Sequence, residues 1–391
     1  MSVSERDGIA GPAPGGADRR IVELDGIRGL MTILVVISHF FAELPGGHAV
    51  FAHGWVAVTM FFVLSGFLVG RLILEKGHHD NFYTVFYVRR FCRTIPIYVV
   101  CVLGSFLVFS QMPARWSDFD AAFPLWSYLT FSQNFLMISS GSIGAYWLAP
   151  TWTLTVEEHF YLVAPALMLL TPRRHLVAAL MVAILAALAL RALLIAGGLS
   201  PMAGLVLFPA RADLVIVGLL AAALLLRGGI AWERLDGLLR VAPVLLLTLA
   251  AGLGAVVGSS GALFKVVGPL IVAVACAAFL LAVVRGAPEA RRFRSPVLRF
   301  FGWSSYAVYL THLPIFWLMH GLILGEKPAL GTPEQWAVSL LALPVCALAG
   351  WGLTRLVEEP ISNYGRTWTW GSASAAGGAR RAVEPPSAMV R

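Results

Sequence analysis

Blocks of roughly twenty apolar residues recur along this chain, and they constrain its fold more than any other feature. A helix of about 20 apolar residues is long enough to cross roughly 30 Å of hydrocarbon. Hydrophobic residues make up 58% of the chain and charged residues 13%, against roughly 45–50% and 25% in soluble domains. A soluble core cannot bury so many such blocks. The sequence therefore predicts an all-α, polytopic membrane helical bundle with about ten transmembrane helices.

The predicted spans are 24–43, 53–74, 94–110, 151–170, 176–196, 213–227, 241–257, 266–285, 300–324 and 336–357. They form one predicted transmembrane domain over residues 21–365, between disordered tails at 1–20 and 366–391. The first tail lacks the apolar core of a cleavable signal peptide. Between spans, Leu125–Met137 is apolar but too short to cross upright, which predicts an interfacial or re-entrant helix. Any chemistry is therefore expected inside the bundle or at its mouth.

The net charge of +8 is distributed unevenly over the predicted loops. Most Lys and Arg residues fall in loops on one side, and the opposite side holds only Arg115, Arg191, Arg211, Lys265 and Lys327. Such an asymmetry places the basic side in the cytoplasm, so both termini are predicted to be cytoplasmic. The basic charge then orients the protein and lies near anionic lipids, and no nucleic-acid partner is expected. The four scattered cysteines predict neither disulfides nor a metal site.

The first predicted span contains Arg28 and His39. An ionisable residue inside a span is energetically expensive and is a candidate functional residue for that reason. Eleven residues separate the two, so on a helix they lie near one face and roughly 16 Å apart along the axis. Two readings remain open: a functional pair, or an arginine reaching the interface and a histidine hydrogen-bonded to a neighbouring helix.

Glu157 and Glu158 lie in the fourth predicted span, roughly 10 Å below its outer end. That depth is close to the depth of His39. The two side chains point about 100° apart, so they cannot both meet one partner in the same way. One of them could orient His39 and stabilise its charged form, as general-base catalysis requires. A charge pair that locks helices together is the alternative.

Further polar residues are found in the third, sixth and ninth predicted spans. Tyr309 and His312 share one helix face with Ser305, which suits either a binding site or packing between helices. A basic cluster at the cytoplasmic start of the third span is either a topological anchor or a phosphate site, because arginine matches phosphate oxygens; it consists of Arg89, Arg90 and Arg93. Arg211 and Asp213 predict an interfacial ion pair or a contact with substrate.

Six segments together resemble acyltransferase family 3, the bacterial membrane O-acyltransferases that modify surface polysaccharides, lipids and some secondary metabolites. The segments are LDGIRGL with Arg28 and His39, MFFVLSGFL, YVRRFCRTIPIY, TWTLTVEEHFYLVAP, FPARADLVIVGLLAA and SSYAVYLTHLPIF. They follow the family's order across nearly the whole chain. In the second segment, Ser65-Gly66 is read as a small pair that permits close helix packing, because the GxSxG pattern of a serine nucleophile is absent.

The resemblance implies transfer of an acyl group, usually acetyl, from cytoplasmic acyl-CoA to a hydroxyl of a glycan or glycolipid at a bacterial cytoplasmic (inner) membrane. It implies His39 as the catalytic base with Arg28, and one of Glu157 and Glu158 as an acidic motif residue. The cluster of Arg89, Arg90 and Arg93 would bind the donor, although its RRxxR spacing departs from the RxR variants. The predicted substrate contacts are Tyr309, His312, Arg211 and Asp213.

Several alternatives remain open at this level. His39 either deprotonates the acceptor or carries the acyl group transiently. The acceptor could instead be a small secondary metabolite. A transporter of a lipid-linked sugar is a less favoured function, because no inverted repeat is evident. Some relatives carry a further SGNH-type hydrolase domain, for which this chain is too short. The sequence does not indicate an oligomeric state.

Overall fold

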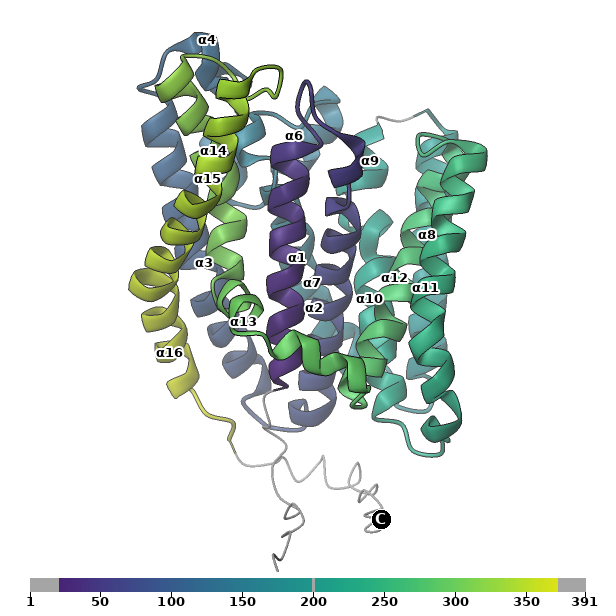
Figure 1. Ribbon diagram of the computed structural model, residues 1–391. Helices are drawn as coiled ribbons and strands as arrows, with labels where there is room; N and C mark the ends of the chain where they lie inside the picture. Colours follow the sequence, from purple (N-terminus) through teal and green to yellow (C-terminus); the bar gives the residue numbers. More distant parts are fainter. Residues whose placement is uncertain (1–20, 199–200, 372–391) are drawn as a thin grey trace, which may run out of the picture.

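The computed structural model describes residues 21–198 and 201–371, which fold into a bundle of helices with no strand in those ranges (Figure 1). Nine helices of this described part are long and apolar enough to cross a membrane. They comprise α1 (Val22–Phe41), α2 (Gly54–Lys76), α3 (Phe82–Phe109), α8 (Leu176–Ala196), α10 (Phe208–Leu225), α11 (Trp232–Val257), α12 (Ala262–Val284), α14 (Ser305–Leu324) and α15 (Pro333–Leu353). We call the end where α1 begins the lower end, as in Figure 1, and the opposite end the upper end.

The fourth predicted span, 151–170, is not among these nine helices but is present as helix α7 (Thr151–Leu170). Its 20 residues match the length of a membrane crossing. Consecutive polar residues, Glu157, Glu158 and His159, lower its mean hydropathy, so it is not among the nine most apolar helices. In Figure 1 it lies among α1 and α2 in the middle of the bundle, and its three consecutive polar residues are partly buried there.

Short helices cap the upper end: η1 (Ala49–Phe51), α4 (Ala114–Ser117), η2 (Phe119–Ala121), α5 (Leu125–Leu129), α6 (Gln133–Ser140), η3 (Tyr146–Leu148) and α9 (Pro201–Val206). The single interfacial helix predicted over Leu125–Met137 is wrong, because the chain turns between α5 and α6. Phe131 adopts a φ of 54° there, which no helix continues through. At the lower end, η4 (Pro288–Arg294) and α13 (Pro296–Trp303) cross in front of α1 (Figure 1).

Helix α3 begins at Phe82, well before the predicted start of its span at residue 94. The extra turns are covered by the end of the chain: α15 continues through a π-helical segment, η5 (Thr354–Glu358), into α16 (Glu359–Thr367), which packs on α3. Residues 366–371, predicted to be disordered, instead bind α3. The rest of the predicted tails, 1–20 and 372–391, lies outside the described residues.

Helices α2 and α10 pack against each other at backbone contact. A side chain at Gly66 would place its Cβ 1.9 Å from the Val215 carbonyl oxygen, and one at Gly218 would place its Cβ 2.1 Å from the Val63 carbonyl oxygen. Small residues permit this approach in membrane proteins, where tight van der Waals packing holds helices together. Gly66 therefore has the packing role predicted for the Ser65-Gly66 pair.

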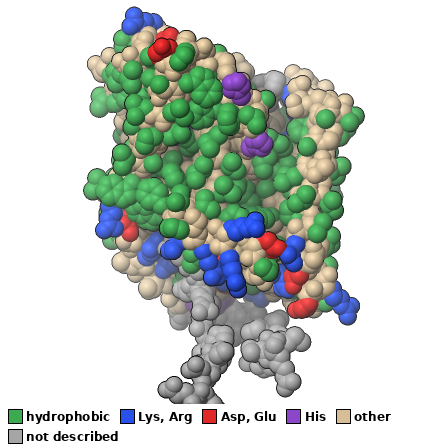
Figure 2. Space-filling model, viewed as in Figure 1, with side chains coloured by type: hydrophobic (Ala, Val, Ile, Leu, Met, Phe, Trp, Pro, Cys, Tyr) green, Lys and Arg blue, Asp and Glu red, His purple; other side chains and the backbone are tan. Residues whose placement is uncertain are grey.

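The surface shows the separation of apolar spans and basic loops that the sequence predicts. In Figure 2 a broad belt of hydrophobic side chains covers the middle of the visible face, and Lys and Arg gather below it. The lower-end segment η4 and α13 contributes many of them, including Arg291, Arg292, Arg294 and Arg299. This segment lies where lipid headgroups and water would meet the bundle, as expected for basic residues that flank membrane spans.

Candidate functional site

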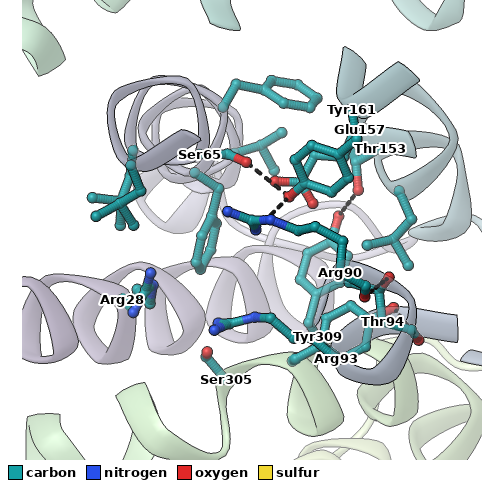
Figure 3. Close-up of a pocket in the computed structure, with 17 residues that line it drawn as sticks. Arg28, Ser65, Arg90, Arg93, Thr94, Thr153, Glu157, Tyr161, Ser305 and Tyr309 are labelled. Atoms are coloured by element: carbon teal, nitrogen blue, oxygen red, sulfur yellow. Dashed lines mark hydrogen bonds between the residues drawn. The ribbon is translucent and has the colours of Figure 1, made fainter. Parts of the chain in front are cut away.

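A cavity of about 110 Å³ lies inside the bundle between α1, α2, α3, α7 and α14 (Figure 3). Its residues on α2 run from Val58 to Leu68, which spans roughly 15 Å of helix. Apolar side chains of α2 and α7 form part of its walls, and the lining residues that carry polar groups are Arg28, Ser65, Arg90, Arg93, Thr94, Thr153, Glu157, Tyr161, Ser305, Tyr306 and Tyr309. A cavity that combines apolar walls with convergent polar groups is typical of a small-molecule site.

Three arginines, one from α1 and two from α3, line this cavity and give it positive charge. Arg28 donates to Asp25 Oδ1 at 3.2 Å. Arg90 lies over the Tyr161 ring at 4.7 Å and donates to its hydroxyl at 3.4 Å. Arg93 follows Arg90 by almost one turn, and Figure 3 shows both side chains extending from α3 into the cavity. Arginines grouped in this way favour a multiply charged anion such as a phosphate ester.

The third arginine of the cluster, Arg89, points elsewhere. Its guanidinium donates to the carbonyl of Trp368 at 3.0 and 2.7 Å and lies 5.1 Å from the centre of the Trp370 ring. These contacts hold the chain after α16 against α3. The geometry thus separates the RRxxR cluster into two arginines at the cavity and one at the C-terminal segment.

The two adjacent glutamates of α7 have different surroundings, in agreement with their predicted angular separation. Glu157 lines the cavity next to Ser65 and Tyr161, whose hydroxyls are hydrogen-bonded at 3.0 Å. Glu158 lies outside it and accepts a hydrogen bond from Thr94 Oγ1 at 2.9 Å. Of the two, Glu157 is therefore placed to contact a molecule in the cavity.

Two tyrosines of α14 close the cavity on one side. The Tyr309 hydroxyl is hydrogen-bonded to Thr153 Oγ1 at 2.8 Å near the start of α7 (Figure 3). The Tyr306 hydroxyl donates to the Thr94 carbonyl at 3.1 Å. Tyr309 thus lies at the upper part of the cavity.

The histidines of the first and ninth predicted spans meet above the cavity. His39 Nδ1 and His312 Nε2 are 2.7 Å apart, and the two rings are nearly parallel, at 12°. His312 is fully buried, whereas 16% of the His39 side chain is exposed. His312 follows Tyr309 by one turn, roughly 4.5 Å of rise. The histidine pair therefore lies directly beyond the upper part of the cavity.

The carboxylate beside His39 is Glu43, not Glu157 or Glu158 as expected. Glu43 Oε2 lies 3.7 Å from His39 Nε2. Ser38 donates to one oxygen of Glu43 at 3.1 Å, and the Tyr146 hydroxyl donates to the other at 2.7 Å. Burial, together with the nearby Glu43 carboxylate, raises the pKa of the Tyr146 phenol above its ordinary value, so Tyr146 keeps the proton that it donates. These donors hold the carboxylate in place.

The predicted pair between Arg211 and Asp213 is not the ion pair that the structure contains. Both oxygens of Asp213 accept hydrogen bonds from Arg191 at 2.8 Å, and both side chains are almost fully buried. Arg191 comes from α8, at a position that sequence spacing had assigned to the outer side. Arg211 is buried next to the Trp152 ring, 5.9 Å from its centre, and neither Arg211 nor Asp213 lines the cavity.

We expect the Asp213→Asn substitution to destabilise the fold rather than to weaken substrate binding. It leaves the Arg191 guanidinium, 1% exposed, without a counter-charge, and breaking a buried pair in this way costs about 3–5 kcal/mol of unfolding free energy. Thermal unfolding of the purified protein measures the effect. Asp236→Asn is the matched control, because Asp236 pairs with Arg285 but its side chain is 45% exposed. A higher KM with unchanged thermal stability in Asp213→Asn would contradict this structural role.

Several polar residues of the site were not among the predicted site residues. Tyr161 follows Glu157 by four residues, so helical periodicity alone could have placed both on one face. Thr153 precedes Glu157 by the same interval. Ser65 was predicted to serve packing, and Glu43, the last residue of the first predicted span, follows His39 by four residues. No pattern in the sequence links Glu43 to Tyr146, because that contact joins loops about a hundred residues apart.

Comparisons with known proteins identify the family of this chain. Residues 21–352 match the family described as "Acyltransferase domain", acyltransferase family 3. The chain is 29% identical over 155 residues to O-acetyltransferase OatA of Staphylococcus aureus, and 30% over 157 residues to peptidoglycan O-acetyltransferase OatA of Listeria monocytogenes. Each of these matches covers 38% of this chain and 24% of the relative.

A longer match is found with acyltransferase MdmB of Streptomyces mycarofaciens, which is 29% identical over 389 residues, covering 87% of this chain and 91% of the relative. No solved structure matches the chain. The family match extends from the start of α1 nearly to the end of α15, and it includes every residue that lines the cavity and both members of the histidine pair. The chain therefore belongs to acyltransferase family 3, a family of enzymes that transfer acyl groups.

Proposed function

We propose that this protein is a membrane-embedded O-acyltransferase that moves an acyl group, acetyl in the simplest case, from cytoplasmic acyl-CoA to a hydroxyl of a glycan or glycolipid. The observation that carries the proposal is the order of groups along the bundle. Three arginines and Tyr309 line a cavity, Tyr309 lies next to a histidine pair, and one of these histidines is partly exposed near the upper end.

The donor is proposed to enter from the lower end. The Lys and Arg concentrated at that end support a cytoplasmic orientation of the lower end (Figure 2). The proposed location is the cytoplasmic membrane of a bacterium, in keeping with the bacterial relatives. The phosphates of acyl-CoA would bind Arg90 and Arg93, with Arg28 facing them from α1. Since Arg28 and His39 are on one uninterrupted helix, roughly 16 Å of rise separates the phosphate site from the histidine. The pantetheine arm would extend through that interval along the apolar walls.

Within the cavity, Glu157, Tyr161 and Ser65 supply hydrogen-bonding groups beside the arginines. The proposed role of these three residues is to hold Arg90 and the pantetheine arm in position, because Arg90 contacts Tyr161. Glu158 contacts Thr94 instead and is assigned to supporting α3 against α7. Tyr309 would contact the end of the arm that carries the thioester, because it lies closest to the histidine pair along α14.

The acceptor is proposed to arrive at the upper end, where His39 and Glu43 are accessible. His39 takes the proton of the acceptor hydroxyl while the hydroxyl oxygen attacks the thioester carbonyl carbon. The new C–O bond forms, the C–S bond breaks, and the electron pair leaves with the sulfur of CoA, which takes up the proton. A glycan acceptor is favoured because the relative from Listeria monocytogenes is a peptidoglycan O-acetyltransferase.

Two measurements test this function. Purified protein supplied with labelled acetyl-CoA should release free CoA thiol and transfer label to an oligosaccharide acceptor. Mass spectrometry of surface glycans and lipids should show loss of the mass of one acetyl group from a glycan when the protein is absent. Absence of any acetyl-CoA turnover together with export of a lipid-linked sugar would contradict the proposal in favour of a transporter. Loss of the acetyl group from a small secondary metabolite instead of a glycan would change the acceptor only.

A further inference from the structure

The hydrogen bonds of the histidine pair determine which nitrogen of His39 is free to accept a proton. His312 Nδ1 faces two backbone carbonyl oxygens, of Tyr309 at 2.8 Å and of Val308 at 3.2 Å. A carbonyl oxygen only accepts hydrogen bonds, so Nδ1 carries the hydrogen of the His312 ring. In a fully buried, neutral imidazole the other nitrogen, Nε2, is then an acceptor.

The same logic extends to His39. Its Nδ1 lies 2.7 Å from His312 Nε2, and since that atom accepts, His39 Nδ1 must donate. In neutral His39 the remaining nitrogen, Nε2, therefore has a free lone pair. This lone pair lies on the side of Glu43, at 3.7 Å from Oε2, a distance too long for a direct hydrogen bond.

We propose that His312 is a positioning residue that fixes the tautomer of His39, leaving Nε2 as the proton-accepting atom of the acyl transfer, with Glu43 stabilising the imidazolium that results. This inference rests on the proposed O-acyltransferase function. When the acceptor hydroxyl loses its proton to Nε2, positive charge develops 3.7 Å from a carboxylate that Ser38 and Tyr146 hold in place. The arrangement has the logic of a Ser-His-Asp triad, but here a second histidine orients the base and the carboxylate lies on the side of the reacting nitrogen.

Two variants of His312 and one of His320, both buried on α14, test whether His312 positions His39 or only fills space in the bundle. His312→Leu removes the acceptor for His39 Nδ1–H, and we expect kcat for acetyl transfer from acetyl-CoA to fall on the order of 10²–10⁴-fold with KM for acetyl-CoA unchanged. His312→Gln places an amide oxygen near the former Nε2, and kcat should stay within about tenfold of the unsubstituted protein. His320→Leu is the matched control, because His320 is also fully buried on α14 but hydrogen-bonds Ser339; it should keep kcat.

The pH dependence of kcat/KM gives an independent readout. The titratable groups that face His39 are Glu43, Tyr146 from η3 and His312 from α14. Removing the negative charge with Glu43→Gln disfavours the protonated form of His39. The acid limb of the profile should therefore shift to lower pH. A merely structural role of Glu43 would lower the rate equally at every pH and leave the limb where it is.

The assay uses acetyl-CoA as donor and an oligosaccharide of N-acetylglucosamine as acceptor. A second reaction omits the oligosaccharide, so that water is the acceptor, and measures release of CoA thiol by hydrolysis. His312→Leu with the kcat of the unsubstituted protein overturns the inference, as does an equal loss in His312→Gln and His312→Leu when both unfold at the temperature of the unsubstituted protein. Failure of the proposed function is distinguishable, because the unsubstituted protein itself would then turn over no acetyl-CoA with either acceptor.

Discussion

Replacing His39 by alanine is expected to lower the rate of acyl transfer on the order of 10²–10⁴-fold, the contribution of a well-placed general base. His39 is partly exposed at the end of α1, directly beyond the cavity that would hold the donor, and its ring is oriented by a 2.7 Å hydrogen bond to His312. A methyl group in its place cannot take a proton from the acceptor hydroxyl. Initial rates of label transfer from acetyl-CoA to an oligosaccharide measure the loss.

Binding of the donor should survive this substitution, because His39 lies roughly 16 Å along α1 from Arg28. The affinity for CoA, measured by titration calorimetry, should be unchanged in His39→Ala. His53→Gln is the control for loss of a histidine near the upper end, since His53 is exposed at the start of α2. Full acyl transfer by His39→Ala would exclude His39 as the catalytic base, and with it the proposed reaction path.

The second large effect is expected for the cavity arginines. Replacing Arg90 and Arg93 together by methionine should weaken CoA binding on the order of 10²-fold or more, since one hydrogen bond between charged groups contributes about 1.5–3 kcal/mol. Methionine keeps much of the aliphatic length, so the walls of the cavity remain. The KM for acetyl-CoA should rise correspondingly, while kcat at saturating donor changes less.

Two single substitutions control this measurement. Arg299→Met removes an exposed arginine of α13 at the same end of the bundle and should leave CoA affinity unchanged. Arg89→Met distinguishes the sequence prediction from the geometry: Arg89 contacts the Trp368 carbonyl outside the cavity, so its loss should affect CoA binding far less than loss of Arg93. Equal weakening by Arg89→Met and Arg93→Met would instead support the whole RRxxR cluster as the phosphate site.

Much of the architecture could be predicted from local pattern because membrane hydrocarbon imposes a simple rule. A backbone inside lipid must satisfy its own hydrogen bonds, so every apolar block of sufficient length becomes a helix. Helix α1 begins and ends within two residues of its predicted span. The boundary of α3 could not be predicted in the same way, because its lower turns are polar and depend on α16 and residues 366–371 for cover.

Helical periodicity also indicated correctly that Glu157 and Glu158 face different surroundings and that Tyr309 and His312 lie on one side of α14. It could not show which helix each side chain meets. The partner of Asp213 is a case in point: Arg211 is two residues away in sequence, but on α10 the carboxylate is directed towards α8 and pairs with Arg191.

The amino-acid sequence by itself determined that this chain is a membrane helical bundle, and it identified Arg28, His39 and the basic cluster as candidates, because charge inside a span is too expensive to occur without a partner or a function. The tertiary structure alone decided how these residues are combined. Contacts between segments distant along the chain brought His312 to His39, fixed Glu43 beside His39 through Tyr146, drew Arg89 away from the cavity, and placed Glu157 within it. Such pairings depend on helix rotation and tilt, which are set by packing between helices, including the backbone contact of α2 with α10 at Gly66.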